Sequence, residues 1–423
     1  MWLGNTFGRA IRGQSPPADA SRARPKRITR DLTGRIALRV GACLGVVLIA
    51  SYGPFTTPSG ATSAKGTPIV VGNIGSYQGS QASTFAPAQA ALEAWASSVN
   101  ASGGIDGHPV HLIIKQDNDT PSLAVSDVNE LIQQDHAVAI IDFSDIETSW
   151  TPTAQKAGVA VIGAGLGAPT LAGDKLFFPS GTSLLPSNYG TLYALKQKGI
   201  TKIGIPYCAE VAACSQDVPV ITPIAKQLGM QVVWSGAFSA TAPDYTAQCL
   251  AMQQAGVQGV VPVAPTASAI RIATACAAQG LHVTYGTQDA AVSSQWLSVP
   301  AFNGAVISDF DAPWFATSTP AEKAFHDAVA KYAPGEPIVP PSMHVWTAGK
   351  LFEAAVSASG SSHVTPSSVL AGLYKLKGAT LGGLTPPLTF TKGKVPMVNC
   401  FFVAGIKNGK FNEPQGSTVS CQK

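Results

Sequence analysis

A glycine-rich stretch in the first half of the chain has the spacing of a phosphate-binding loop. An apolar run, residues 159–162, leads into residues 163–168, GAGLGA, which fits the pattern G-x-G-x-x-G/A of dinucleotide-binding folds. In those folds the pattern follows the first strand, and an acid about 20 residues further on binds the ribose. Here several expected strands and helices precede the glycines, and residues 181–186 contain no acid. We therefore interpret the stretch as a strand end followed by a loop and expect no cofactor.

Two pairs of aspartates have spacings that occur in metal and acid–base sites. Asp117 and Asp119 begin like a calcium-binding loop, but the downstream glycine and glutamate of that loop are missing, which favours a helix-capping turn. Asp309 and Asp311 form the second pair, and two acids this close on a loop are common by chance. The chain contains no G-x-S-x-G, P-loop or H-E-x-x-H motif. These patterns favour a protein that is not an enzyme and holds no metal.

The N-terminal segment, residues 1–64, is first strongly basic and then apolar. Nine basic and two acidic residues occupy positions 1–39, and an apolar run from Val40 to Ala50 follows. This run is short for a membrane span and has the length of a signal-peptide core. An uncleaved anchor formed by residues 39–50 is the alternative. We predict an exported protein, secreted or held at the cell surface, whose folded part begins near residue 65.

The rest of the chain is slightly acidic, although the formal net charge of the whole sequence is +4. Removing positions 1–39 from the totals of 28 basic and 24 acidic residues leaves 19 and 22. Arg271 is the only arginine after Arg39. A folded part with this charge balance is not expected to bind nucleic acid.

Six cysteines follow the N-terminal segment, which contains the seventh, Cys43. An even number of cysteines in an exported protein favours disulfide bonds. Six cysteines allow 15 connectivities, and the spacing suggests sequential pairing. A metal cluster is the alternative, but the sequence has no C-x-x-C motif and no nearby histidine pair. The expected pairs are Cys208–Cys214 across a short loop, Cys249–Cys276 between successive helices and Cys400–Cys421 around a C-terminal hairpin.

Apolar runs of strand length alternate with helical segments along most of the chain. One series extends from residue 68 to about residue 165, and a second from about residue 186 to residue 288. In the first series, Thr120 is expected as an N-cap with Pro121 at the first helical position. Alternating strands and helices form parallel sheets through right-handed crossovers. The pattern predicts two α/β lobes, followed by further helices and a strand-rich C-terminus.

Four segments distributed over the chain resemble a known family. They are NASGGIDGHPVHLIIKQDND at residues 100–119, KAGVAVIGAG at 156–165, DYTAQCLAMQQAGVQGVV at 244–261 and PSMHVWTAGKLFEAAV at 341–356. Together they resemble type I periplasmic binding proteins, the solute-binding proteins of branched-chain amino acid transporters, such as leucine/isoleucine/valine-binding proteins. The resemblance covers the chain from about Pro68 to its C-terminus, and the combination of segments is what makes it specific.

The resemblance implies an α/β fold of two Rossmann-like lobes with parallel sheets, joined by a hinge of three chain crossings. The first lobe would comprise residues 65–185 and 312–378, and the second residues 186–311 and 379–423. Strand C-terminal ends and helix N-termini would face an interlobe cleft, where open α/β sheets bind ligands. Closing of the lobes would enclose a solute, and the implied partner is the membrane permease of an ABC transporter.

The resemblance also implies residues of the first lobe that contact the solute. Family members that bind amino acids hold the carboxylate with a hydroxyl-bearing loop after the third strand, which makes Ser144, Thr148 and Ser149 candidates here. Thr148 or Ser149 as the N-cap of the following helix is the alternative. The next loop usually supplies a threonine, but Gly167 stands at that position, with Gly165 on the same loop.

In the second lobe of such proteins, an acid usually meets the amine of the amino acid. Gln288 stands at that position, with Asp289 beside it. The other implied contacts are Tyr207, Glu210, Pro265 and Thr266 on the second-lobe wall, and Tyr77 and Gln78 on the loop after the first strand.

These departures from the family pattern argue against an ordinary α-amino acid as the ligand. A missing threonine hydroxyl and a missing acid would leave a buried ammonium group poorly matched, at a cost on the order of several kcal/mol. We expect a small polar or amphipathic solute, an amino acid or related compound, captured by a monomer outside the cytoplasm and delivered to an ABC transporter. A membrane-anchored, ligand-sensing ectodomain of the same fold is the alternative.

Overall fold

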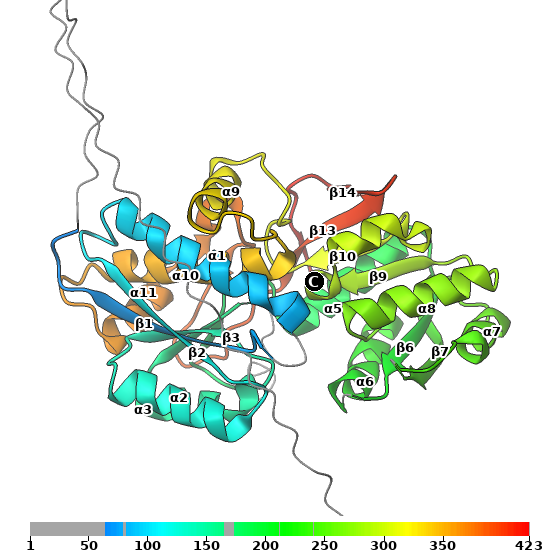
Figure 1. Ribbon diagram of the computed structural model, residues 1–423, viewed down its shortest axis with the longest axis horizontal. Coiled ribbons are helices and arrows are strands. Elements are labelled where there is room, and N and C mark those ends of the chain that lie inside the picture. Colours follow the sequence, from blue (N-terminus) through cyan, green and yellow to red (C-terminus); the bar gives the residue numbers. More distant parts are fainter. Residues whose placement is uncertain (1–63, 79–81, 165–172, 211, 240, 423) are drawn as a thin grey trace, which may run out of the picture. The chain divides into compact units, whose positions relative to one another are not determined.

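The computed structural model describes residues 64–422 with the exception of residues 79–81, 165–172, 211 and 240 (Figure 1). The predicted signal peptide or anchor, and the site candidates Gly165 and Gly167, lie outside the described residues. None of the helices in the described part is both long and apolar enough to span a membrane.

The first lobe is built on a parallel sheet of five strands, as the alternation of strands and helices predicts. The strand order is β2-β1-β3-β4-β5. All residues of the last three strands are buried, because helices cover both faces of the sheet. The strands are β1 (Ile69–Gly75), β2 (Val110–Gln116), β3 (Ala139–Phe143), β4 (Ala160–Gly163) and β5 (Phe177–Pro179).

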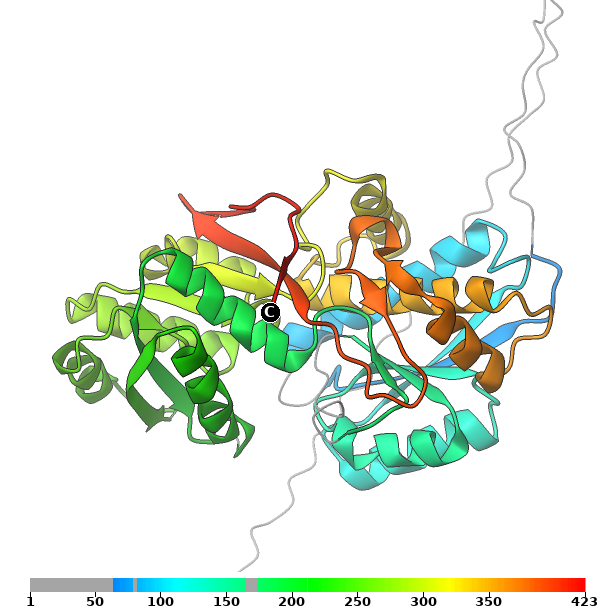
Figure 2. The same ribbon diagram turned by 180° about the vertical axis from the view of Figure 1, so that it is seen from behind.

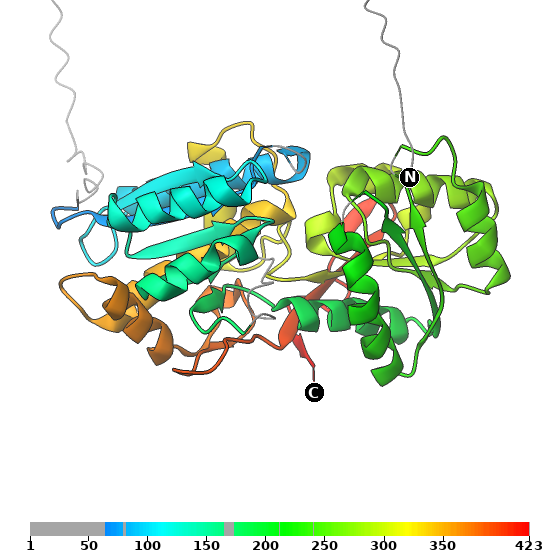
Figure 3. The same cartoon turned by 90° about the horizontal axis from the view of Figure 1, so that it is seen from below.

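Helices from distant parts of the chain cover this sheet (Figures 1 and 3). One face is packed by α2 and α3, whose Leu131 and Ala154 share a buried cluster with Val161 of β4. The other face carries α1, α10 and α11, where the rings of Trp95 and Phe352 meet edge to face at 6.3 Å. The helices are α1 (Ala82–Ala101), α2 (Pro121–Gln133), α3 (Thr151–Ala157), α9 (Pro320–Tyr332), α10 (Pro340–Ser359) and α11 (Pro366–Lys375).

The second lobe holds a larger sheet in the order β14-β13-β10-β9-β8-β6-β7, with β15 paired to β13. Strands β6 to β10 pair in parallel, whereas β10 and β13 are antiparallel. The C-terminal segment therefore adds an antiparallel edge to a parallel sheet, drawn in red in Figure 2. The strands are β6 (Lys202–Cys208), β7 (Gln231–Phe238), β8 (Gly259–Val260), β9 (Thr284–Gln288), β10 (Val306–Asp309), β13 (Cys400–Lys407), β14 (Lys410–Asn412) and β15 (Ser420–Cys421).

Four helices accompany this second sheet. Helices α5 and α6 enclose one buried cluster with the sheet, formed by residues such as Leu195, Ile203 and Ile221. Helices α7 and α8 belong to the main hydrophobic cluster through Met252 and Ile272. A separate two-stranded ladder, β11 (Lys377–Ala379) with β12 (Leu388–Thr389), precedes β13 in the chain. The helices are α5 (Leu184–Gln197), α6 (Ala212–Gln227), α7 (Thr246–Gln254) and α8 (Thr266–Ala278).

The chain passes between the two sheets three times, and one threonine contacts all three passages. Thr182 lies on the first passage, and its hydroxyl oxygen is 2.9 Å from the carbonyl oxygen of Phe310 on the second and 2.8 Å from that of Cys400 on the third. The Thr182 N–H also donates to Phe310 O at 2.7 Å. At Gly181 a Cβ would lie 2.5 Å from this same oxygen, so the close approach of the passages requires glycine.

The glycine motif of residues 163–168 has a packing explanation at its first position. Gly163 ends β4, and a Cβ there would lie 2.2 Å from the ring of Phe177 on the neighbouring strand. In a sheet of order 2-1-3-4-5, β2 lies on one side of β1, and β3 and the later strands lie on the other. The switch point between β1 and β3 is where such sheets bind nucleotides. Gly163 lies at the end of a different strand, in agreement with its interpretation as a strand end.

Three disulfide bonds join the six cysteines in the sequential order that their spacing suggests. Cys208–Cys214 links the end of β6 to the first turn of α6, and Cys249–Cys276 links α7 to α8. Cys400–Cys421 closes β13 onto β15. All three bridges lie within the second lobe, and none of them spans the two sheets.

Thr120 occupies the N-cap position of α2, and Pro121 is the first helical residue, as the sequence predicts. The Thr120 side chain makes no capping bond, however, and its hydroxyl donates to the carbonyl oxygen of Asn118. The neighbouring Asp117 is buried and contacts the ends of two other strands, so its role extends beyond this turn.

Candidate binding pocket

A hydrogen-bond network ties together the loops that follow the first three strands of the first sheet. The buried carboxylate of Asp117, after β2, accepts from the hydroxyl of Ser76, after β1, at 2.9 Å and from that of Ser144, after β3, at 2.6 Å. The Ser144 oxygen in turn accepts from Trp150 Nε1 and Ile146 N, both at 3.2 Å. The structure therefore gives Ser144, a predicted carboxylate contact, a full set of protein partners.

The other two hydroxyl candidates of this loop lie in a short 3₁₀ turn, Glu147–Ser149. Ser149 Oγ donates to the carbonyl oxygen of Ile146 at 2.7 Å, and Thr148 is exposed. The alternative that either residue caps the following helix is wrong, because Trp150 occupies the N-cap position of α3.

Tyr77 and Gln78, after β1, differ in exposure. Tyr77 is buried, its hydroxyl donates to Asn73 Oδ1 at 3.0 Å, and its ring stacks with that of Phe143 at 6.1 Å. Burial strongly raises the pKa of the Tyr77 hydroxyl, so the group is a neutral donor. Gln78 is exposed. The hydroxyl of Tyr77 thus forms its hydrogen bond inside the first lobe.

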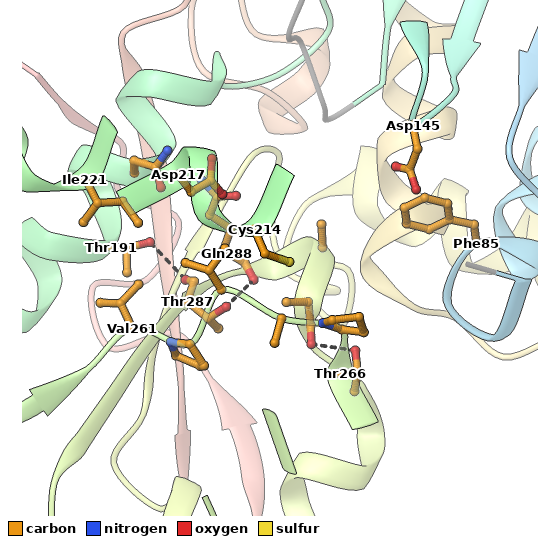
Figure 4. Close-up of a pocket in the computed structure, with 17 residues that line it drawn as sticks. Phe85, Asp145, Thr191, Cys214, Asp217, Ile221, Val261, Thr266, Thr287 and Gln288 are labelled. Carbon is orange, nitrogen blue, oxygen red and sulfur yellow. Dashed lines mark hydrogen bonds between the residues drawn. The ribbon is translucent and has the colours of Figure 1, made fainter. Parts of the chain in front are cut away.

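A cavity of about 330 Å³ lies where the second sheet presents the carboxyl ends of β8 and β9 (Figure 4). Phe85 of α1 and Asp145 of the loop after β3 line it from the first lobe. Carboxyl ends of parallel strands are the usual ligand site of open α/β sheets. The second lobe contributes Asn188, Thr191, Cys214, Asp217, Ile221, Val261, Pro262, Val263, Ala264, Pro265, Thr266, Thr287, Gln288, Ala290 and Ala291. Among the sequence candidates, Pro265, Thr266 and Gln288 therefore lie together in this cavity.

Three threonines on the cavity wall use their hydroxyl hydrogens within the protein. Thr191 donates to the carbonyl oxygen of Thr287 at 3.1 Å, and Thr287 donates to that of Gln288 at 3.1 Å. Thr266 donates to the carbonyl oxygen of Ala291 at 2.7 Å. The Thr191 hydroxyl thus links α5 to β9, and the Thr266 hydroxyl links α8 to the segment after β9. With their hydrogens in use, the three hydroxyls can only accept from a solute.

Three other polar side chains on the wall have groups free for a solute. Asn188 is 6% exposed, and its Nδ2 has no hydrogen-bond partner among the described residues. Asp217 and Gln288 are half-buried and make no side-chain hydrogen bond within the described part of the chain. Burial raises the pKa of the Asp217 carboxyl. The wall thus combines a donor, a carboxyl group and an amide with an apolar surface.

Sequence reasoning did not identify Asn188 and Asp217. Both lie in the second turn of a helix that follows a strand end, because α5 begins at Leu184 and α6 at Ala212. The expectation that helix N-termini face the cleft applies to α5 and α6. Polar residues near the N-terminal ends of these two helices are therefore the sequence signal that could have identified Asn188 and Asp217.

Lining residues with positive charge are absent from the described part of the cavity, whereas two lining residues, Asp145 and Asp217, carry carboxyl groups. Asp145 is exposed and has interactions of its own. Within residues 64–422, outside the gaps given above, no group of three histidine, cysteine or acidic side chains could hold a metal ion. The arrangement can bind a small molecule by shape, apolar contact and hydrogen bonds.

Comparison with known proteins identifies the family. Residues 68–410 match the family described as periplasmic binding protein. The chain is a type I periplasmic binding protein. The proteins of this family are non-enzymatic solute-binding proteins of ABC transporters and act outside the cytoplasm. No curated protein matches the sequence.

Solved structures share the fold of this periplasmic binding protein at low sequence identity. A branched-chain amino acid ABC transporter protein from Thermus thermophilus with bound valine has 16% identity and a TM-score of 0.73, covering 83% of this chain and 96% of its own. A fatty acid ABC transporter substrate-binding protein from Thermomonospora curvata has 20% identity and a TM-score of 0.69, with 84% and 95% covered. A solute-binding protein from R. palustris in complex with 4-hydroxybenzoate has 16% identity and a TM-score of 0.65, with 84% and 96% covered.

The periplasmic binding protein also contains three buried acids and a buried histidine where the chain passes between the sheets, here called the hinge acid cluster: Asp289, Asp309, Asp311 and His344. Asp289, expected beside the solute, is absent from the cavity lining. Its Oδ2 lies 2.8 Å from His344 Nε2 of α10 and accepts from Phe310 N at 3.2 Å. The pair thus joins the second lobe to a helix of the first.

Asp309, Asp311 and His344 of the hinge acid cluster have raised pKa values. Burial raises the pKa of Asp311 to about 7, against a smaller opposing effect of His344. Burial and the neighbouring Asp289 raise the pKa of Asp309, both of whose oxygens lack a partner among the described residues. Although burial alone would lower the pKa of His344, the adjacent Asp289 and Asp311 carboxylates raise it. The cluster therefore holds protons around neutral pH.

The last two sequence candidates of the second lobe lie outside the cavity lining. Tyr207 is half-buried on β6 and forms a bridge with Val263, which itself lines the cavity. Glu210 is exposed and accepts from the hydroxyl of Ser239 at 2.6 Å.

Proposed function

We propose that this protein captures a small amphipathic solute in the cavity at the ends of β8 and β9 and delivers it to the permease of an ABC transporter. The observation that carries the proposal is the composition of the wall. An apolar surface surrounds three polar side chains, Asn188, Asp217 and Gln288, that have groups free for a partner. Pockets that bind small molecules combine a largely apolar lining with a few such polar groups.

The size and family context support this proposal. A cavity of about 330 Å³ lies in the range of small-molecule pockets. The similar structures include proteins whose ligands are valine and 4-hydroxybenzoate and one that serves a fatty acid transporter, so proteins of this fold accept solutes of different chemistry. The permease is the partner that such a role requires.

Native mass spectrometry of the purified protein tests this proposal. We expect the wild-type protein to carry a small molecule in a one-to-one complex. Replacing Ala264, on the cavity wall, by tryptophan (A264W) should fill the cavity and remove the adduct, whereas the same change at the exposed Ala324 of α9 (A324W) should retain it. An adduct that persists in A264W would contradict the location of the site.

The proposal further places the mature protein outside the cytoplasm as a monomer. N-terminal sequencing of the protein from its producing cells separates the two fates of residues 1–64. A start near Lys65 supports a released or separately retained binding protein. A chain that keeps residues 39–50 supports the membrane-anchored sensor instead.

A further inference from the structure

The described hydroxyl groups of the cavity wall, and those of Ser144 and Ser149, already use their hydrogens within the protein. Ser144 donates to Asp117 and Ser149 donates to a backbone carbonyl. The three wall threonines, Thr191, Thr266 and Thr287, also donate to backbone carbonyls. A hydroxyl has one hydrogen to give, so binding a carboxylate through any of these groups would first break an internal hydrogen bond.

The charge of the lining also disfavours a carboxylate. The described lining contains the carboxyl groups of Asp145 and Asp217 and no lysine, arginine or histidine. Among the described lining side chains, the donors left for a solute are the neutral amide groups of Asn188 and Gln288, which bring no positive charge to a carboxylate. Burying an anion beside another acid without a cation is strongly unfavourable.

Asp217, in contrast, favours a positively charged group on the solute. It lies on α6 at the wall of the cavity, half-buried, and has no donor or cation among the described residues (Figure 4). Burial raises its pKa, so a solute cation would return it to the ionised form. A carboxylate and an ammonium group form the strong, charge-assisted class of hydrogen bond.

We infer that the solute presents a protonated amine to Asp217 and carries no carboxylate, with a neutral acceptor such as a hydroxyl or carbonyl oxygen for Asn188. Its apolar body packs on Ile221, Val261 and Phe85. The Gln288 amide supplies a further neutral hydrogen bond at the same wall. This inference rests on the proposed function, because it names the class of solute taken by that site.

Matched compounds that share a carbon skeleton and differ in charge test this inference. Isothermal titration of wild-type protein would compare isopentylamine, leucinol and leucinamide with leucine and isocaproate, and phenethylamine with phenylpropanoate. We expect at least one amine to bind about tenfold more tightly than the carboxylate and the zwitterion of its skeleton. That ratio is the usual effect of one charge-assisted hydrogen bond.

Two variants assign the preference to Asp217. Asp217→Asn should lower the affinity for the amine at least about tenfold, because it removes the charge and keeps the shape. Asp327→Asn, on the exposed side of α9, should leave the affinity unchanged. The comparison of compounds on the wild-type protein does not depend on the folding of either variant.

The remaining outcomes separate this inference from the proposed function. Carboxylates that bind as tightly as the amines, or amine binding that survives D217N, would overturn the solute class while leaving solute binding in place. Failure of every compound would also overturn the class. The native mass spectrum, which requires no choice of ligand, then decides the proposed function by itself.

Discussion

Asp217 and the hinge acid cluster place carboxyl groups in two different surroundings within one protein. Asp217 is half-buried, borders a cavity and has a pKa raised by burial alone. Asp289, Asp309 and Asp311 are buried at the chain passages, and burial and neighbouring carboxyl groups raise the pKa values of Asp309 and Asp311. An acid that borders a cavity can be neutralised by a positively charged solute. Acids enclosed by the fold must be neutralised by protons or by the imidazole, so their ionisation affects stability rather than recognition.

The largest effect should follow from breaking the one charged pair of the cluster. His344→Ala removes the imidazole partner of Asp289 Oδ2 and leaves a buried carboxylate with only the Phe310 N–H as a donor, which should lower the free energy of unfolding by about 3–5 kcal/mol. Urea denaturation near pH 7 measures this change. His282→Ala, at an exposed histidine of the second lobe, is the matched control and should have little effect. A loss below about 1 kcal/mol at His344 would mean that the pair does not stabilise the hinge.

The next effect is a dependence of stability on pH. The pKa of Asp311 is raised from 3.8 to about 7, so the ionised unfolded state is favoured increasingly as the pH rises from about 4 to about 7. His344, whose pKa is raised, stabilises the fold below its ordinary pKa of 6.5, and this contribution is lost as the pH rises through the folded value. Stability of the wild-type protein should therefore fall with rising pH across this window.

Asp311→Asn isolates the acid's share of this dependence. The asparagine cannot ionise, so the variant should lose less stability than wild type when the pH rises from about 5 to about 8. The two losses in free energy of unfolding should differ by about 1–3 kcal/mol. Urea denaturation at the two pH values gives both differences. Parallel curves for variant and wild type would show that Asp311 titrates normally in the folded protein.

A smaller effect on stability is expected from the uncharged hydrogen bonds that Thr182 makes between the chain passages. Thr182→Val removes the hydroxyl that lies 2.9 Å from Phe310 O and 2.8 Å from Cys400 O, and should cost about 1–2 kcal/mol of unfolding free energy at any pH. Thr182→Ser keeps the hydroxyl and should recover most of the loss. Equal losses in the two variants would assign the effect to packing of the threonine methyl group.

The smallest effect on stability is expected at the pocket acid. Asp217→Asn makes the same chemical change as Asp311→Asn, but its carboxyl is in contact with solvent, so the stability of the solute-free protein should change by less than about 1 kcal/mol. Thermal denaturation without added solute measures it. If D217N and D311N altered stability equally, the distinction between an acid for binding and acids for the hinge would be lost.

Much of the fold follows from local patterns in the sequence. The alternation of strands and helices predicts two α/β lobes, and the cysteine spacing suggests the sequential bridges because each pair belongs to neighbouring elements. The Thr120–Pro121 start of α2 is equally local. The domain bounds at 185/186, 311/312 and 378/379 stay predictions. The antiparallel order of β13 beside β10 depends on contacts between distant segments, which a pattern does not specify.

The site was less predictable, because side-chain direction and hydrogen-bond partners arise from packing between distant residues. The sequence identifies Ser144 as a hydroxyl on a loop, but only the fold shows that Asp117, on another strand, takes its hydrogen. Asp309 and Asp311 look like a chance pair until the passages bury them beside Asp289. Asp217 lies on a helix whose cavity-facing side depends on how α6 packs. The contact of each remaining candidate with a solute stays a prediction.

Titration of the co-purified solute into protein freed of ligand tests the central claim, that the cavity at β8 and β9 is the site of capture. We predict one site per chain in wild type and in A324W, and binding at least about a hundredfold weaker in A264W, because the indole fills the cavity. Circular dichroism establishes that both variants are folded. Wild-type affinity in a folded A264W protein would contradict the account, since the solute would then be held elsewhere.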